Sequence, residues 1–311
     1  MKSVSSIGLA LVGAVILGPA RLVAQEPARA GTHAHASHAT ATPSLRFDNV
    51  GLATGIRMHY AEQGDPAGHA VVLLHGWSDS WFSFSPILPL LPQSYHVYAL
   101  DLRGHGESGK PAGGYTMKEM AADVLAFMDA KGIVRATVVG HSLGSFIAQH
   151  VAYAAPDRME GLVLVGAVST PDRINSMMEL KAVVDGFTDP VPGTFIREFQ
   201  ESTIHVPVPP AFLDRVVQES AKLPAHVWKG VAAGIVSPWQ TAGAATGYPV
   251  FILWGDQDAM MPRVEQDALL AKFPRATLEI YTETGHALHW ERPERFARDL
   301  NRFLDSRNAS R

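Results

Sequence analysis

Short apolar runs alternate with amphipathic stretches along most of this chain. The apolar runs predict buried strands at 70–74, 96–100, 137–139, 161–165, 250–254 and 277–281. Apolar positions at helical spacing predict helices at 117–131, 146–155, 264–273 and 294–306. Two extended segments, 45–50 and 56–63, are joined by turn residues and indicate an antiparallel edge pair. This alternation favours an α/β fold, a mostly parallel eight-stranded sheet with helices on both faces.

The alternation is interrupted between residues 169 and 247. This segment lacks buried strands of the same kind, and its pattern predicts helices at 174–187, 194–204, 211–223 and 226–235. Long excursions of this kind are usually functional, and the active residues of parallel sheets lie at the carboxyl ends of the strands. We therefore expect residues 169–247 to form a helical cap, and 45–168 with 248–311 to form the core. A further helix, interrupted by prolines, is expected at 84–91.

The N-terminus has the order of features typical of a secretory signal. In residues 1–30 a lysine is followed by an apolar stretch at 7–17 and then by small residues. The apolar part is short for a bilayer span, so we expect cleavage and export to the periplasm or the medium. The alternative is an uncleaved membrane tether, and the cleavage point stays open. Residues 31–44, rich in His, Ala and Thr, predict a linker whose histidines indicate at most a loose metal site.

The composition narrows the class of protein. The 311 residues are 47% hydrophobic and 18% charged, as in globular proteins with a substantial core. The net charge of -4 and the absence of a basic cluster give no indication of a nucleic-acid partner. Because the chain has no cysteine, it contains no disulfide, no thiol nucleophile and no thiolate metal ligand.

The pattern Gly140-His141-Ser142-Leu143-Gly144 lies between a predicted strand and a predicted helix. A serine at so sharp a turn is strained and projects from the sheet, and glycines are needed beside it because side chains would collide with neighbouring elements. The N–H of Leu143 opens the helix, where unpaired amides and the helix dipole favour a developing negative charge. This context indicates a nucleophilic serine.

Five motifs, each expected directly after a strand, make the chain similar to the α/β-hydrolase fold family, in its serine hydrolase branch with a helical cap. The motifs are His75-Gly76-Trp77, Asp101 to Ser108, Gly140 to Gly144, Trp254 to Asp258, and Gly285-His286 with Glu291-Arg292-Pro293. The resemblance covers essentially all of the chain beyond the linker. It implies esterase-like or lactonase-like chemistry.

A serine nucleophile needs a general base, and the base needs an orienting carboxylate. The resemblance implies the chain order nucleophile, acid, histidine. It places Ser142, Asp258 and His286 in these roles, with His286 identified by the preceding Gly285. Other histidines near the site are His75 and His105, both in loops, and His289, which is expected to be a packed or rim residue.

The acid has alternatives. The G-x-x-D pattern of the family aligns with Gly255 and Asp258, which leaves Asp256 as a turn residue that caps nearby amides. Asp172, at the start of the expected cap, is the nearest substitute if the acid comes from another strand.

The oxyanion of an acyl-transfer reaction needs two hydrogen-bond donors, each contributing about 3 kcal/mol. One is the N–H of Leu143, and the resemblance assigns the other to the N–H of Trp77. The loop from Arg103 to Ser108 is expected to be structural. Some apolar residues of the cap are expected to face the site, among Met177, Met178, Phe195, Phe199, Phe212, Trp228 and Trp239.

These features predict an exported serine hydrolase that cleaves a small apolar carboxylic ester or lactone, without a metal or organic cofactor. The resemblance disfavours haloalkane dehalogenases and epoxide hydrolases, which have an aspartate where Ser142 stands. Alternatives are a carbon-carbon bond hydrolase, a cofactor-free haloperoxidase, or a ligand-binding receptor on the same scaffold. The first of these is less favoured, because His141 stands where carbon-carbon bond hydrolases commonly have asparagine. The oligomeric state stays open.

Overall fold

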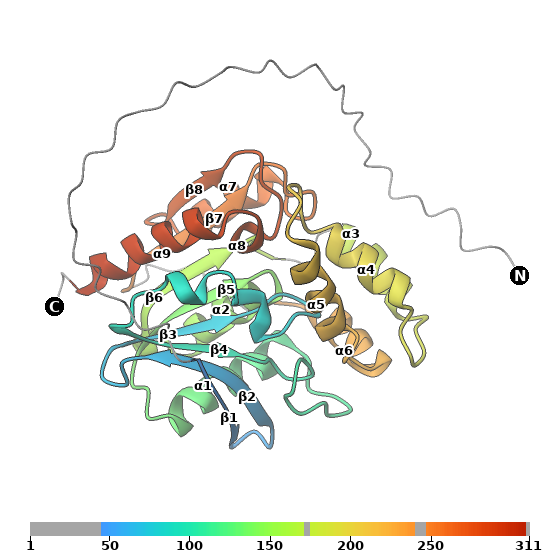
Figure 1. Cartoon of the computed structure of the whole chain (residues 1–311), viewed down its shortest axis with the longest axis horizontal. Helices are drawn as coiled ribbons and strands as arrows, with labels where there is room; N and C mark the ends of the chain where they lie inside the picture. The colour runs from blue at the N-terminus through green and yellow to red at the C-terminus, as the bar shows by residue number, and fades with distance from the viewer. Residues whose placement is uncertain (1–44, 171–174, 240–246, 309–311) are drawn as a thin grey trace, which may run out of the picture. The chain divides into compact units, whose positions relative to one another are not determined.

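The computed structural model describes residues 45–170, 175–239 and 247–308. They contain an eight-stranded sheet with the strand order β1-β2-β4-β3-β5-β6-β7-β8 (Figure 1). The strands are β1 Arg46–Gly51, β2 Arg57–Gly64, β3 His69–Leu74, β4 Tyr95–Leu100, β5 Ala136–His141, β6 Met159–Val165, β7 Val250–Gly255 and β8 Thr277–Tyr281. Only β2 runs antiparallel to its two neighbours, and the other pairs are parallel. The prediction of a mostly parallel eight-stranded sheet is confirmed.

The central strands are buried along their whole length, which is why they appear in the sequence as short apolar runs. Their register brings the carboxyl ends together. Leu74 of β3 pairs with Leu100 of β4 and with Gly140 of β5. The loops that follow these strands therefore emerge at one edge of the sheet.

Helices cover both faces of the sheet, as predicted. They are α1 Met117–Ala130, α2 Leu143–Ala154, α7 Arg263–Lys272, α8 Leu288–Glu291 and α9 Pro293–Asn308. Buried residues of α1 and α2 pack with Val72 and Val138, whereas those of α9 pack with Val71 and Val139. Because neighbouring residues of a strand point to opposite faces, these are two separate cores.

Between β6 and β7, the described residues 175–239 form four helices: α3 Asn175–Val184, α4 Gly193–Glu201, α5 Pro210–Ser220 and α6 Ala225–Ile235. We call residues 169–247 the helical insertion. Figure 1 draws its helices in yellow to orange, beside the sheet. Trp228, fully buried, makes ring contacts with Phe187, Phe195 and Phe199 of the insertion and with Trp77 of the core. Aromatic packing thus joins the insertion to the loop after β3.

Two features differ from the sequence-based expectation. The segment at 84–91 forms no α-helix. It starts at the last residue of one short 3₁₀ helix, η1 Trp81–Phe84, and contains a second, η2 Leu88–Leu90. Its prolines lack the N–H that an α-helix interior requires.

The short helix α8 was not predicted. The predicted signal and linker, with its histidines, and Asp172 lie outside the described residues. Within the described ranges, no helix has both the length and the apolar character needed to cross a membrane.

Candidate active site

Ser142 occupies a sharp turn between β5 and α2. Its φ of 49° and ψ of -117° are rare for a residue with a side chain, and such strain is typical of functional sites. The flanking glycines allow the turn to form. A Cβ at Gly140 would lie 2.2 Å from the carbonyl oxygen of Gly144, and one at Gly144 would lie 2.1 Å from that of Leu74. Both positions therefore exclude a side chain, as the sequence predicted.

Asp258 and His286 are paired at the ends of β7 and β8. Oδ2 of Asp258 lies 2.7 Å from Nδ1 of His286, and both side chains are almost completely buried. The other carboxylate oxygen, Oδ1, accepts the N–H groups of Met260 and Met261 at 2.9 Å each. The carboxylate is thus fixed at both oxygens. Because Nδ1 must donate to Asp258, the lone pair of a neutral imidazole resides on Nε2.

Nε2 of His286 is buried and has no hydrogen-bond partner among the described residues. A buried polar atom without a partner needs an explanation. His286 and Ser142 line the same cavity, and Ser142 is only partly exposed. An unpaired imidazole nitrogen beside a serine hydroxyl is suited to accept its proton.

Two backbone amides are available as donors, that of Trp77, which lines the cavity, and that of Leu143, which follows Ser142 in the chain. Within residues 45–170, 175–239 and 247–308, neither the N–H of Trp77 nor that of Leu143 has a hydrogen-bond acceptor. Leu143 is the first residue of α2, where N–H groups have no partner within the helix. Trp77 lies in the loop after β3 and forms part of the cavity wall.

The cavity has a volume of about 10 Å³, enough for about one water molecule. Apolar and polar side chains share its wall. The residues that line it are Gly76, Trp77, Asp79, His141, Ser142, Phe199, Gln200, Thr203, Met260, His286 and Trp290. Phe199, Gln200 and Thr203 come from α4 and the residues after it, so the helical insertion forms one wall of the cavity.

Near the pair of Asp258 and His286, burial shifts the pKa of three titratable groups in the direction that favours their uncharged forms. Burial raises the pKa of the Asp79 carboxyl from 3.8 to about 7, despite hydrogen bonds from Gln200 and Ser83 that oppose the shift. Burial also lowers the pKa of His289 to about 3 and holds that of His141 well below its ordinary value. His141 donates from Nε2 to the carbonyl oxygen of His286 at 3.2 Å. Its neutral ring therefore supports the backbone of the His286 loop.

The carboxylate of Glu291 joins the His286 loop to the helical insertion. It accepts the N–H of Gly285 at 2.9 Å, that of His205 at 3.0 Å and that of Val206 at 2.7 Å. The carbonyl oxygen of Thr203 accepts the N–H groups of His286 and Ala287 at 2.9 and 3.0 Å. The backbone on both sides of His286 is thus held by residues that follow α4.

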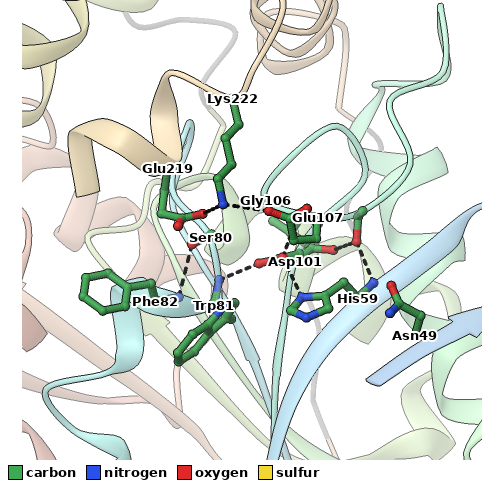
Figure 2. A network of polar contacts seen from close by, with 12 residues as sticks. Asn49, His59, Ser80, Trp81, Phe82, Asp101, Gly106, Glu107, Glu219 and Lys222 are labelled. Carbon is green, nitrogen blue, oxygen red and sulfur yellow. Dashed lines mark hydrogen bonds and ion pairs between the residues drawn. The ribbon is translucent and has the colours of Figure 1, made fainter. Parts of the chain in front are cut away.

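A second polar network organises the loops after β3 and β4 (Figure 2). The buried carboxylate of Asp101 accepts the N–H of Trp81 at 2.7 Å and that of Glu107 at 2.9 Å, and it lies 2.8 Å from Nδ1 of His59. Lys222, in the insertion, bridges Glu107 and Glu219 at 2.7 Å each. The loop from Arg103 to Ser108 thus fixes the strand ends, as expected.

The remaining sequence candidates lie elsewhere. His75 donates from Nδ1 to the carbonyl oxygen of Gly76 and accepts the N–H of Leu102 on Nε2, so its ring is used within the loops. Nδ1 of His105 donates to the carbonyl oxygen of Arg103, and His289 is packed in the interior. Asp256 is exposed, and its carboxylate accepts the Gln257 side chain rather than backbone amides.

Of the seven apolar insertion residues considered as candidates, only Phe199 lines the cavity among the described residues. Sequence reasoning did not single out Asp79, Gln200, Thr203, Met260 or Trp290. No periodicity marks these positions, because each faces the cavity from a loop or a helix end. Among the described residues, no group of three or more His, Asp or Glu side chains is arranged to hold a metal ion.

A mostly parallel sheet that gathers serine, histidine and aspartate side chains at its strand ends is the architecture of an α/β enzyme. The family model of the alpha/beta hydrolase fold matches residues 69–293. The chain therefore belongs to the α/β-hydrolase fold family.

Individual relatives differ in activity. The chain is 33% identical over 266 residues to a dihydrolipoyllysine-residue acetyltransferase component of an acetoin cleaving system from Cupriavidus necator, covering 80% of this chain and 66% of that one. It thus spans just under two thirds of that relative. It is 37% identical over 117 residues to soluble epoxide hydrolase from Corynebacterium sp. strain C12, covering 38% of this chain and 40% of that one. A thermophilic esterase from Thermogutta terrifontis has a similar structure, with a TM-score of 0.75, 23% identity, and coverage of 84% and 99%, which shows the shared fold.

Proposed function

We propose that this protein is an exported serine hydrolase that cleaves a carboxylic ester or lactone through an acyl-enzyme. The observation that carries the proposal is the unpaired Nε2 of His286, whose ring is fixed by Asp258 beside the strained turn of Ser142. A buried imidazole that is oriented on one nitrogen and unpaired on the other suits a general base.

In the proposed reaction, Oγ of Ser142 attacks the carbonyl carbon while Nε2 of His286 takes its proton. The N–H groups of Trp77 and Leu143 stabilise the oxyanion. His286 then returns the proton to the leaving alcohol, and a water molecule, activated in the same way, releases the acid. Asp258 holds the ring of His286 through Nδ1 and stabilises the imidazolium that forms.

The wall of the cavity supports a small, largely apolar substrate. Trp77, Phe199, Met260 and Trp290 supply apolar surface around Ser142. We assign to the helical insertion the role of a cap, because α4 closes one side of this cavity. Export is supported by the pattern of residues 1–30 in the sequence.

Epoxide hydrolysis is disfavoured despite the relative from Corynebacterium. Enzymes of that type resemble this chain but use an aspartate nucleophile, and Ser142 occupies the corresponding position. A serine hydroxyl forms an ester with an acyl group but does not replace a carboxylate in opening an epoxide.

The test is hydrolysis of a short p-nitrophenyl ester and a panel of lactones by the protein and by Ser142→Ala. Ser237→Ala, which changes a serine at the end of α6 outside the cavity wall, is the matched control. We expect turnover that is lost in Ser142→Ala and retained in Ser237→Ala. A folded protein without turnover on any ester or lactone would contradict the proposal, and ligand-induced stabilisation without product release would then favour a receptor.

A further inference from the structure

The N–H of Trp77 belongs to a tight turn from Gly76 to Asp79. The turn is closed by the N–H of Asp79, which donates to the carbonyl oxygen of Gly76 at 3.2 Å. Its third residue, Ser78, has a φ of 67°. Turns with a positive φ at this position favour glycine, since a side chain there is strained by about 1–3 kcal/mol. This conformation persists only where the surroundings hold it.

The contacts that hold the Ser78 side chain come from the helical insertion. Nε2 of Gln200, in α4, donates to Oγ of Ser78 at 2.9 Å and to Oδ1 of Asp79 at 3.0 Å. Oγ of Ser220, in α5, lies 2.9 Å from the same nitrogen, so the two hydrogens of the amide are shared among three acceptors, and it accepts the hydroxyl of Ser78 at 3.2 Å. No other partner of the Ser78 hydroxyl is found in the described part of the chain.

All four of these polar side chains are buried. Ser78 and Ser220 are 0% exposed, Gln200 is 1% exposed and Asp79 is 3% exposed. Water therefore does not replace a lost partner at low cost, and an unmade hydrogen bond here is expensive. The turn depends on Gln200 to stay in its strained form.

The core offers the turn fewer restraints. Oγ of Ser83 donates to Oδ2 of Asp79 at a long 3.3 Å, and the imidazole of His75 contacts the turn through its hydrogen bond to the carbonyl oxygen of Gly76. Neither contact reaches Ser78. Among the described residues, the side-chain contacts of Ser78, the residue after Trp77, therefore come from the insertion.

We propose that Gln200 is a positioning residue, through which the helical insertion holds the turn that presents the Trp77 N–H to the oxyanion. The oxyanion site is then complete only when α4 is seated on the turn. This inference rests on the proposed ester hydrolysis, in which the Trp77 amide has its role. It makes the insertion a part of the catalytic apparatus as well as a wall of the substrate site.

The test compares Gln200→Leu with Lys222→Met. Leucine removes the amide from the turn, whereas Lys222→Met removes the ion pair between the insertion and Glu107 without touching the turn. Loss of one oxyanion donor costs about 10²–10³-fold in kcat. For Gln200→Leu we expect kcat to fall by between about 10-fold and that limit, with KM changed by less than about threefold, because the donor acts on the transition state. Lys222→Met is expected to retain kcat.

A second variant tests the reason for the loss. Glycine adopts a positive φ without strain, so Ser78→Gly combined with Gln200→Leu is expected to recover part of the kcat that Gln200→Leu loses. If Gln200→Leu does not fold, Gln200→Asn shortens the side chain and withdraws the amide from the turn, with the same expectation. Equal effects of Gln200→Leu and Lys222→Met on kcat, or an effect on KM alone, would overturn the proposal.

Hydrogen exchange separates this inference from the proposed function. We expect Gln200→Leu to speed deuterium uptake in peptides that cover Gly76 to Ser80, while peptides from β5 and β6 exchange as in the parent protein. This readout needs no substrate. If the parent protein hydrolyses no ester, the proposed function fails, but hydrogen exchange still tests whether Gln200 holds the turn. If Gln200→Leu leaves the exchange of the turn unchanged, the positioning role of Gln200 is overturned whatever the activity.

Discussion

Asp79 gives a direct test of the electrostatics at the candidate site. Its carboxyl is 3% exposed and burial raises its pKa from 3.8 to about 7. The groups that face it are Gln200, Ser83, Nδ1 of His141 at 3.9 Å and the more distant His286. Asparagine at position 79 preserves the shape of the side chain and cannot ionise. Asp79→Asn therefore removes one titration and little packing.

The sign follows from the raised pKa. Above pH 3.8 the unfolded chain releases the Asp79 proton, whereas the folded protein retains it up to about pH 7. The native protein thus loses stability as the pH rises through this window, by about 1.4 kcal/mol per pH unit and about 4 kcal/mol in all. Asp79→Asn does not lose stability in this way, because the asparagine side chain does not titrate. We expect its stability relative to the parent protein to rise between pH 4 and 7 and to stay level above pH 7.

The assay is urea unfolding of both proteins between pH 5 and 8, because the difference between the two free energies of unfolding cancels the other titrating groups. We expect this difference to grow by about 3 kcal/mol over that interval, with an unchanged denaturant slope. A constant difference over this interval would show that the folded protein releases the Asp79 proton below pH 5, with a pKa that burial does not raise, and this result would refute the reasoning.

Three further changes probe the same site. Asp258→Asn leaves Nδ1 of His286 without its acceptor, and we expect kcat for the best ester to fall by about 10⁴-fold with an unchanged fold by circular dichroism. In Glu291→Gln an NH₂ group replaces one of the oxygens that accept the N–H of Gly285, so we expect about 1–3 kcal/mol lower stability in urea, together with lower kcat. Burial holds the pKa of His289 at about 3, so the folded protein excludes a proton that the unfolded chain binds below pH 6.5. The free energy of unfolding of the parent protein should therefore fall by about 1.4 kcal/mol per pH unit as the pH falls from 6.5 towards 3. We expect a smaller fall for His289→Gln, measured by urea unfolding of both proteins at pH 4.5 and 6.5.

Most of the fold could be predicted from the sequence because each central strand is buried on both faces. A strand that is buried on both faces appears in the sequence as a short apolar run. The sharp turn at Ser142 appears as flanking glycines, because a side chain at those positions would collide with neighbouring backbone. The expected helix at 84–91 was wrong because proline spacing permits short 3₁₀ turns as readily as a broken α-helix.

The candidate site was predictable only where a residue lies in a motif. Asp258 and His286 were identified by short patterns after strands, and the structure places their side chains 2.7 Å apart. Asp79 and Gln200 have no such signal. They are 121 positions apart in the sequence, and they meet only because the insertion packs on the loop after β3. Contacts of this kind depend on tertiary packing that composition and periodicity do not encode.

The size of the cavity restricts how a substrate reaches Ser142. A space of about 10 Å³ does not hold an ester, so side chains must move before the substrate binds. Departure of the whole insertion would release Gln200 from the turn that carries Trp77, and it would free the Thr203 carbonyl from the His286 loop. Phe199 and the flexible side chain of Met260 line the cavity and take part in neither contact. For the proposed reaction we therefore expect the substrate to enter by rotation of these two side chains, with α4 staying in place.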